Sequence, residues 1–267
     1  MKILYTAAEI SPFAKMSNTA DMLRFLPASL QDAGYEIRIL LPKYGHINDR
    51  RNRLHEVIRL SGIEVEVADT VEKMKIKVAS IPNAKLQVYF LDNKTYYKRK
   101  GIFKNPETGN FFKDNDKRVV FYTKAVIETI KKLGWEPNII HCHDYPSGLI
   151  PFIVKKFYQD EPVLKNAKVI FNIHHADNQG QIKADLFKHI GLPEGFDYSE
   201  EVDKDGNVDL LRLGIKYADH VVTGNEITDQ YNDLFEEMGV TPTPIQGAPQ
   251  DVSEKFDNYY KEIASQG

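Results

Sequence analysis

The sequence contains a single cysteine, Cys142, among its 267 residues. One thiol cannot form an intrachain disulfide, and a zinc site built from four cysteines is excluded. No apolar run approaches the ~18 residues of a membrane-spanning helix. The first residues also do not resemble a secretory signal, because a very short apolar run is followed at once by Glu9. We therefore expect a cytoplasmic protein that does not enter a membrane.

The sequence also lacks an excess of charge and the short motifs of several enzyme classes. Lysine and arginine total 35 against 38 acidic residues, a net charge of −3, so we expect no nucleic acid as partner. The phosphate-binding patterns G-x-G-x-x-G and G-x-x-x-x-G-K-[ST] do not occur, nor does the G-x-S-x-G pattern of serine hydrolases. We accordingly expect no cofactor and no serine-based catalytic triad.

What is present is an average globular composition with a regular alternation of short apolar runs and longer helical patterns. Apolar residues make up 42% and charged residues 27% of the chain. The alternation predicts an α/β fold with a doubly wound, mostly parallel, Rossmann-like sheet and helices on both faces. The predicted strands cover residues 2–7, 37–41, 86–91, 138–143, 168–173 and 220–223, and the predicted helices cover 19–34, 119–133, 147–158, 208–217 and 226–238.

Two parts of the chain depart from this alternation. Between residues 57 and 92 apolar residues recur with period two, which predicts a small antiparallel insertion, with residues 86–91 returning to the main sheet. From residue 241 three prolines precede a last helical pattern. We therefore divide the chain into an α/β domain, residues 1–240, and a linker with a packing helix, residues 241–267.

Four polar clusters follow predicted strands or open predicted helices, at 9–21, 114–116, 141–144 and 174–180. In open α/β sheets, ligands bind beyond the carboxyl ends of the strands, so these clusters are the candidate site. Within the run 141–144, strand geometry places His141 and His143 on one face and Cys142 on the other, which removes the third ligand that a metal would need. No metal is expected. The histidines are either core residues or, at the end of a strand and followed by Asp144, ligand-facing; the second interpretation is favoured.

Several motifs occur in an order that resembles a known family. They are K-I-L-Y-T-A-A-E at 2–9, P-F-A-K at 12–15, D-N with Arg118, P-N-I-I-H-C-H-D at 137–144, G-L at 148–149, His174 with Q-G at 179–180, and L-G-I-K-Y-A-D at 213–219. From Met1 to about Asp229 the sequence is similar to the N-terminal catalytic domain of bacterial glycogen synthases and plant starch synthases, glycosyltransferase family 5. These are retaining glucosyltransferases of two-domain GT-B architecture that transfer glucose from ADP-glucose to an α-1,4-glucan.

The resemblance implies roles for particular residues. His143 would hydrogen-bond the transferred glucose and Asp114 would line the same catalytic site, because imidazole and carboxylate groups bind sugar hydroxyls. Lys15 would approach the phosphates of the donor. The other residues of the matched motifs are Ser17 and Asn18 in the donor loop, and Asp21, His174, Gln179 and Gly180 on the sugar-binding side.

The donor loop departs from the family. The family reads KTGGLAD where this chain has K-M-S-N-T-A-D at residues 15–21. Glycine would allow a close backbone approach to phosphate, whereas Ser17 and Asn18 add side chains and can instead cap the following helix. The family's C-terminal domain, which holds most of the nucleotide, also has no counterpart in these residues. We therefore expect about half of a GT-B enzyme.

Three functions follow from these observations. The first is a glucosyltransferase half that is inactive or weak alone and works with a separate C-terminal domain. The second is a non-catalytic glucan-binding or regulatory module. The third is a protein that keeps only the fold. For the isolated polypeptide the second ranks above the first, because catalysis needs groups aimed at the developing phosphate charge. The expected ligands are an α-glucan or a nucleotide sugar. We also expect the face left by the second domain to be covered, by self-association or by the helix around residues 256–263.

Overall fold

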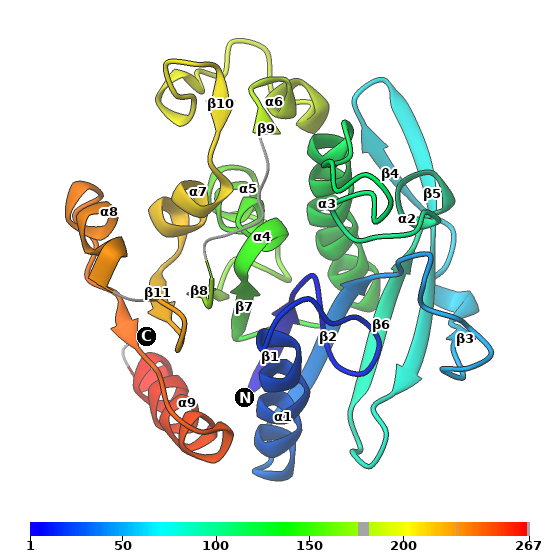
Figure 1. Ribbon diagram of the computed structural model, residues 1–267, viewed down its shortest axis with the longest axis vertical. Helices are drawn as coiled ribbons and strands as arrows, with labels where there is room; N and C mark the ends of the chain where they lie inside the picture. Colours follow the sequence, from blue (N-terminus) through cyan, green and yellow to red (C-terminus); the bar gives the residue numbers. More distant parts are fainter. Residues whose placement is uncertain (176–181, 228, 266–267) are drawn as a thin grey trace.

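The computed structural model describes residues 1–175, 182–227 and 229–265. Within these residues ten strands form one sheet in the order β12-β11-β8-β7-β1-β2-β6-β5-β3, with β4 paired to β5 (Figure 1). All pairs from β12 to β6 are parallel, and β5 is antiparallel to its partners β6, β3 and β4. The strands are β1 (Lys2–Thr6), β2 (Glu36–Pro42), β3 (His55–Glu56), β4 (Ile63–Val67), β5 (Thr70–Ser80), β6 (Gln87–Asp92), β7 (Ile139–His143), β8 (Lys168–Ile173), β11 (His220–Thr223) and β12 (Thr243–Pro244).

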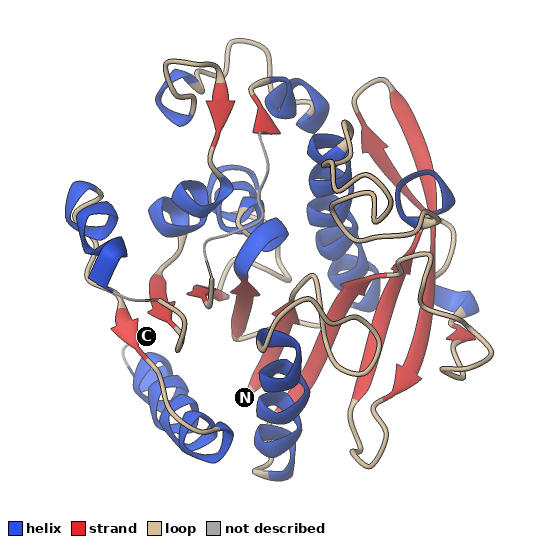
Figure 2. Cartoon of the chain, in the orientation of Figure 1, coloured by secondary structure: helices blue, strands red, loops and turns tan. Residues whose placement is uncertain are grey.

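Helices lie around this sheet, as Figure 2 shows. They are α1 (Thr19–Asp32), α2 (Lys94–Tyr97), α3 (Asn115–Leu133), α4 (Asp144–Ser147), α5 (Leu149–Phe157), α6 (Asp185–Ile190), α7 (Leu210–Tyr217), α8 (Asn232–Glu237) and α9 (Pro249–Ser265). Within the described part of the chain, no helix has both the length and the apolar character needed to cross a bilayer.

The predicted fold class is confirmed. The sheet is mostly parallel with helices around it, and the strand predicted at 86–91 returns to the main sheet as β6, parallel to β2. The region of period two forms the antiparallel strands β4 and β5, as expected. Helix α1 continues through Pro27 as one helix of 14 residues.

Successive side chains of β7 point to opposite faces of the sheet, so the two faces carry different residues. The rings of His141 and His143 lie 4.1 Å apart, on one face. Cys142 is paired in register with Phe171 of β8, so both point to the other face. There Gly214 of α7 lies against the Phe171 ring, and a Cβ at this glycine would come within 2.4 Å of it. The glycine therefore allows α7 to pack closely on the sheet.

Two sequence predictions were wrong in detail. The helix predicted at 226–238 is only α8, preceded by a short 3₁₀ turn, Asp229–Tyr231. Gly224 and Asn225 are instead hydrogen-bonded to the tail of the chain. Asn225 and Gly247 exchange hydrogen bonds, and Gln246 donates to the Gly224 carbonyl. From residue 182 to the helix predicted at 208–217, where no element was predicted, the structure has α6 and a two-stranded sheet of β9 (Ile182–Lys183) and β10 (Asn207–Val208).

Helix α9 packs beside α1 on the face of the sheet that carries His141 (Figure 1). Its apolar stripe of Val252, Phe256, Tyr260 and Ile263 is buried. The spacing of these residues, four, four and three, is that of one helical face. The Tyr260 hydroxyl forms hydrogen bonds with the Tyr5 hydroxyl, 2.8 Å away, and with Nδ1 of His141, 2.6 Å away. The tail of the chain is thus part of the core.

Candidate functional site

Polar residues gather where three neighbouring parallel strands end. β8, β7 and β1 are adjacent in the sheet, and the chain leaves them toward His174, Asp144 and Glu9 respectively. Since the carboxyl ends of parallel strands share one edge, residues from distant parts of the sequence meet there. All three of these side chains are buried or nearly so.

Glu9 organises the loop that leads into α1. Its carboxylate accepts hydrogen bonds from the backbone N–H groups of Met16 and Ser17, the second at 2.9 Å, and from the Ser17 hydroxyl. Burial alone would raise the pKa of Glu9, but the ion pair with His175 and the hydrogen bonds from Ser17 and the backbone outweigh it and hold that pKa below its ordinary value. The backbone N–H groups of Met16 and Ser17 are therefore already bound to an anion of the protein itself, the Glu9 carboxylate.

His175 lies between two buried carboxyl groups. Its Nε2 is 3.8 Å from Oε1 of Glu9 and 3.9 Å from Oδ2 of Asp144. The interaction with the Glu9 carboxylate raises the pKa of His175 to about 9, against the opposing effect of burial and with help from the charge of Asp144. Near neutral pH His175 is therefore a cation that offsets the charge of its neighbours.

Asp144 combines a strained backbone with a perturbed carboxyl group. Its φ is +48°, the left-handed region that side chains with a Cβ seldom adopt. The carboxylate accepts the backbone N–H groups of His174, at 2.7 Å, and His175, at 3.3 Å. Burial raises the pKa of Asp144 to about 7. Strain and a shifted pKa at one residue of a strand end are typical of functional sites.

Three further histidines form a buried row beside this group. The rings of His143 and His174 stack, with His143 Nδ1 3.0 Å from His174 Nε2, and His141 lies on the other side of His143. Burial lowers the pKa of His141 and of His174 to about 3 and holds that of His143 well below its ordinary value. All three imidazoles are therefore neutral at physiological pH.

The row opens toward a small cavity of about 10 Å³, enough for about one water molecule. His143, Asp144, His175 and Glu9 are among its lining residues. The Nε2 atom of His143 is buried and has no hydrogen-bond partner within the described residues. In the same part of the chain, no group of three or more His, Cys, Asp or Glu side chains is arranged to hold a metal ion.

Comparison with known proteins identifies the family. A model of the starch synthase catalytic domain matches residues 2–230. The chain belongs to this family. It is 40% identical over 227 residues to a glycogen synthase of Chlorobium luteolum, covering 85% of this chain and 46% of that protein, and 42% identical over 226 residues to one of Chlorobaculum tepidum, covering 84% and 46%.

A solved structure shares the fold. The catalytic domain of starch synthase IV from Arabidopsis thaliana, bound to ADP and acarbose, superposes with a TM-score of 0.73 at 20% identity, over 92% of this chain and 51% of that one. The fold is thus that of the GT-B glycosyltransferases of the starch synthase family. The chain spans about half the length of the curated relatives it matches.

Within this starch synthase family domain, the residues predicted as donor-binding lie in the loop before α1. Lys15 pairs with Asp21 at 2.6 Å, and both side chains are about half exposed. Ser17 is held by Glu9, and its hydroxyl accepts the backbone N–H of Thr19, the first residue of α1, whereas the N-cap position is Asn18, whose side chain forms no capping hydrogen bond. Asn18 reaches Glu226 at 3.2 Å.

The remaining predicted residues separate into three groups. His143 and His174 are in direct contact in the buried row, as described above. Asp114 instead forms a two-pronged ion pair with Arg99, at 2.7 and 2.8 Å, and does not line the cavity at His143. Gln179 and Gly180 lie outside the described residues.

Sequence reasoning assigned no role to Glu9, Asp144 or His175, although these residues join the three strand ends. A signal was present for two of them: Glu9 is an acid shortly after a buried strand, and Asp144 directly follows the His-Cys-His run. No local pattern indicates Tyr260, which joins His141 from 119 residues away. Its helix also lies beyond the residues that the starch synthase family model matches.

Proposed function

We propose that this glycogen and starch synthase-like glycosyltransferase domain, residues 1–240, provides the sugar-binding side of a site at which glucose passes from ADP-glucose to an α-1,4-glucan. Support comes from relatives named glycogen synthase and from the starch synthase structure, whose bound molecules are ADP and acarbose. The linker and α9, residues 241–267, complete the core beside this domain.

His143 carries the proposal. It stands at the carboxyl end of β7, is buried and neutral, lines the cavity, and has an Nε2 with no hydrogen-bond partner among the described residues. A neutral imidazole can donate or accept one hydrogen bond at that atom, which suits a sugar hydroxyl. His174 fixes the ring by its contact with Nδ1, so the free nitrogen has a defined direction.

On the donor side, Lys15 is the group we propose for the phosphates. Its partner Asp21 is about half exposed, and such surface pairs contribute only about 0–1 kcal/mol, so a diphosphate with a larger charge can replace the carboxylate. The amides of Met16 and Ser17 are occupied by Glu9. Donor binding would then depend on the lysine side chain rather than on the loop backbone, with Ser17 and Asn18 beside it.

The catalytic-site role of Asp114 and the sugar-binding roles of Asp21, His174, Gln179 and Gly180 belong to the same proposal. Asp114 is held by Arg99, so its oxygens have a fixed position at the start of α3 and accept hydroxyl donors without reorganising. His174 acts through His143, to which it is hydrogen-bonded.

Efficient transfer requires further groups around the departing diphosphate. Curated relatives are about twice as long, and we propose that a second glycosyltransferase domain or another copy of the chain supplies those groups. The residues described here then bind sugar without efficient turnover. A purely glucan-binding or regulatory module is the alternative, and the internal anion at the loop amides favours it.

Calorimetry with maltohexaose and with ADP-glucose tests these roles. We expect His143→Gln to weaken ADP-glucose binding about tenfold or more, because the transferred glucose loses one buried hydrogen bond and another group stays unpaired. Lys15→Ala should remove ADP-glucose binding and leave maltohexaose binding intact. Lys73→Ala, an exposed lysine on β5, is the matched control.

Two results would contradict the proposal. ADP-glucose affinity that is the same in wild type and His143→Gln, with both proteins folded by circular dichroism, would show that His143 does not contact the transferred glucose. ADP-glucose binding that survives Lys15→Ala would place the donor elsewhere. Absence of ADP-glucose binding in the wild type, with glucan binding retained, would favour the non-catalytic module.

A further inference from the structure

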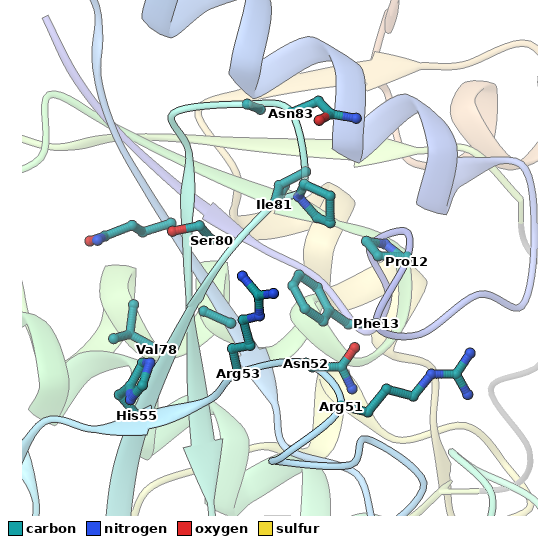
Figure 3. Close-up of a pocket in the computed structure, with 14 residues that line it drawn as sticks. Pro12, Phe13, Arg51, Asn52, Arg53, His55, Val78, Ser80, Ile81 and Asn83 are labelled. Carbon is teal, nitrogen blue, oxygen red and sulfur yellow. The ribbon is translucent and has the colours of Figure 1, made fainter.

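A second and much larger cavity lies away from the histidine row. It has a volume of about 710 Å³ and is formed by the segment 51–55, the hairpin between β5 and β6, and the loop residues Pro12 and Phe13 (Figure 3). This volume falls within the range of small-molecule binding pockets. Pro12 and Phe13 belong to the P-F-A-K motif at 12–15, but the other lining residues lie outside the family motifs and outside the proposed site.

The lining is cationic and contains no acidic residue. Arg51, Arg53 and His55 contribute the basic groups, and Figure 3 shows Arg53 directed into the space between Phe13 and the hairpin. Neither arginine forms an ion pair with any described residue. The nearest acids in the sequence are already engaged, because Asp49 pairs with two lysines and Glu56 pairs with Lys75.

The rest of the lining suits a saccharide attached to an anion. Asn52, Ser80 and Gln87 offer side-chain donors and acceptors for hydroxyl groups. Phe13 provides an apolar ring edge or face for a sugar ring, and its own ring is fixed against Phe90, with centroids 5.0 Å apart. Guanidinium groups bind phosphate through paired N–H donors.

The walls of the cavity are held in place before any ligand arrives. Helix α1 fixes the hairpin, since Arg24 donates to the Pro82 carbonyl at 3.3 Å and Gln31 donates to the Lys85 carbonyl at 2.7 Å. Arg53 and Asn83 both have positive φ, 53° and 64°, and face the same cavity. Backbone strain at a preformed pocket is consistent with a binding role.

We propose that this cavity binds a phosphorylated saccharide, with Arg53 and Arg51 on the phosphate and the polar residues and Phe13 on the sugar. The site is distinct from the one at His143. The two share a loop, however, because Pro12 and Phe13 precede Lys15 and Ser17 on the same segment. The phosphate has two sources, a free sugar phosphate or a phosphate on a glucan chain, and the experiment separates them.

Calorimetry on the full chain uses glucose 6-phosphate, glucose, inorganic phosphate, maltohexaose and a maltohexaose 6-phosphate as probes. We expect glucose 6-phosphate to bind more tightly than glucose or phosphate alone, and its affinity to fall when the salt concentration rises. Arg53→Gln should weaken binding about tenfold or more, because a charge-assisted contact is lost. Tighter binding of the phosphorylated hexaose than of glucose 6-phosphate would identify a glucan chain as the source.

The matched control is Arg59→Gln, an exposed arginine outside the cavity, which should leave all affinities unchanged. Arg51 and Arg53 are also exposed, so their variants are expected to fold. The proposal is overturned if neither phosphorylated probe binds, or if binding persists in Arg53→Gln and Arg51→Gln. Loss of unphosphorylated maltohexaose binding in Arg53→Gln would equally overturn it, since the cavity would then be a neutral glucan groove. The His143→Gln variant should retain phosphorylated-sugar binding, which keeps this result separate from the fate of the other site.

Discussion

Phe256→Ala is expected to lower the free energy of unfolding by about 3–5 kcal/mol. The side chain is 1% exposed and packs on His141 and Tyr260, with ring centroids 5.1 and 5.5 Å apart. Truncation removes this buried surface and leaves a cavity under α9. Since a domain has about 5–15 kcal/mol of stability in all, the variant loses a large share of it. Urea unfolding followed by circular dichroism measures the change.

Two more variants of α9 separate packing from hydrogen bonding. Tyr260→Phe keeps the ring but leaves the Tyr5 hydroxyl and Nδ1 of His141 without this partner, a cost of about 1–3 kcal/mol. Asn258→Ala, exposed on the same helix, is the control and should change stability little. If Phe256→Ala were no more destabilising than Asn258→Ala, α9 would not be part of the core in solution.

The main features of the fold were predictable because they depend on local patterns. Buried parallel strands read as short apolar runs and helices as apolar residues three and four apart, and both signals are strong over β1, β7, β8 and α3. The prediction failed where elements are too short to have a period, such as the two-residue strands β9 and β10. It also failed at the start of the helix predicted at 226–238, where the side chain of Gln246 in the tail donates to the carbonyls of Gly224 and Ile227.

The candidate site was predictable only in part, for a different reason. The strand ends that build it could be located from the sequence, and the two histidines of β7 share a face as strand geometry requires. The pairs of charged groups within the site could not be predicted, because the partners are far apart in the sequence: Glu9 and His175 are separated by 166 positions. A side chain that occupies loop amides, as Glu9 does, leaves no local signature. The paired state of Lys15 and Asp114 is likewise a result of tertiary structure.

Acidification from pH 6.5 is expected to destabilise the protein steeply. Above pH 6.5 the three histidines of the buried row, His141, His143 and His174, are neutral in both the folded and the unfolded chain. Below it the unfolded chain binds protons that His141, His143 and His174 do not, because burial holds their pKa values far lower, near 3 for the first and last. Stability is therefore lost progressively as the pH falls toward 3, and each such proton contributes about 1.4 kcal/mol per pH unit.

Two neighbouring groups act in the opposite direction and set the position of the maximum. The pKa of His175, raised to about 9, gives stability that is complete below pH 6.5 and is lost as the pH rises through 9. Asp144, with its pKa raised to about 7, binds a proton in the folded state that the unfolded chain releases near pH 4, so its contribution is lost as the pH rises to 7. Stability should therefore peak near pH 6.5, measured as the urea midpoint at successive pH values.

The same groups determine the acid slope and provide its control. Between pH ~6 and ~4 the unfolded chain binds three histidine protons that the folded protein does not, and the folded protein binds one proton, on Asp144, that the unfolded chain does not. The net difference of about two protons lowers the free energy of unfolding by about 2.7 kcal/mol for each pH unit of acidification. Asp144→Asn removes the opposing group, so its slope should steepen to about three protons, whereas His141→Asn should reduce it to about one. The two variants thus move the slope in opposite directions whatever they do to stability at pH 7. A stability profile that is flat between pH 6.5 and 5, or slopes that do not respond to these variants, would show that the histidine row is open to water rather than buried.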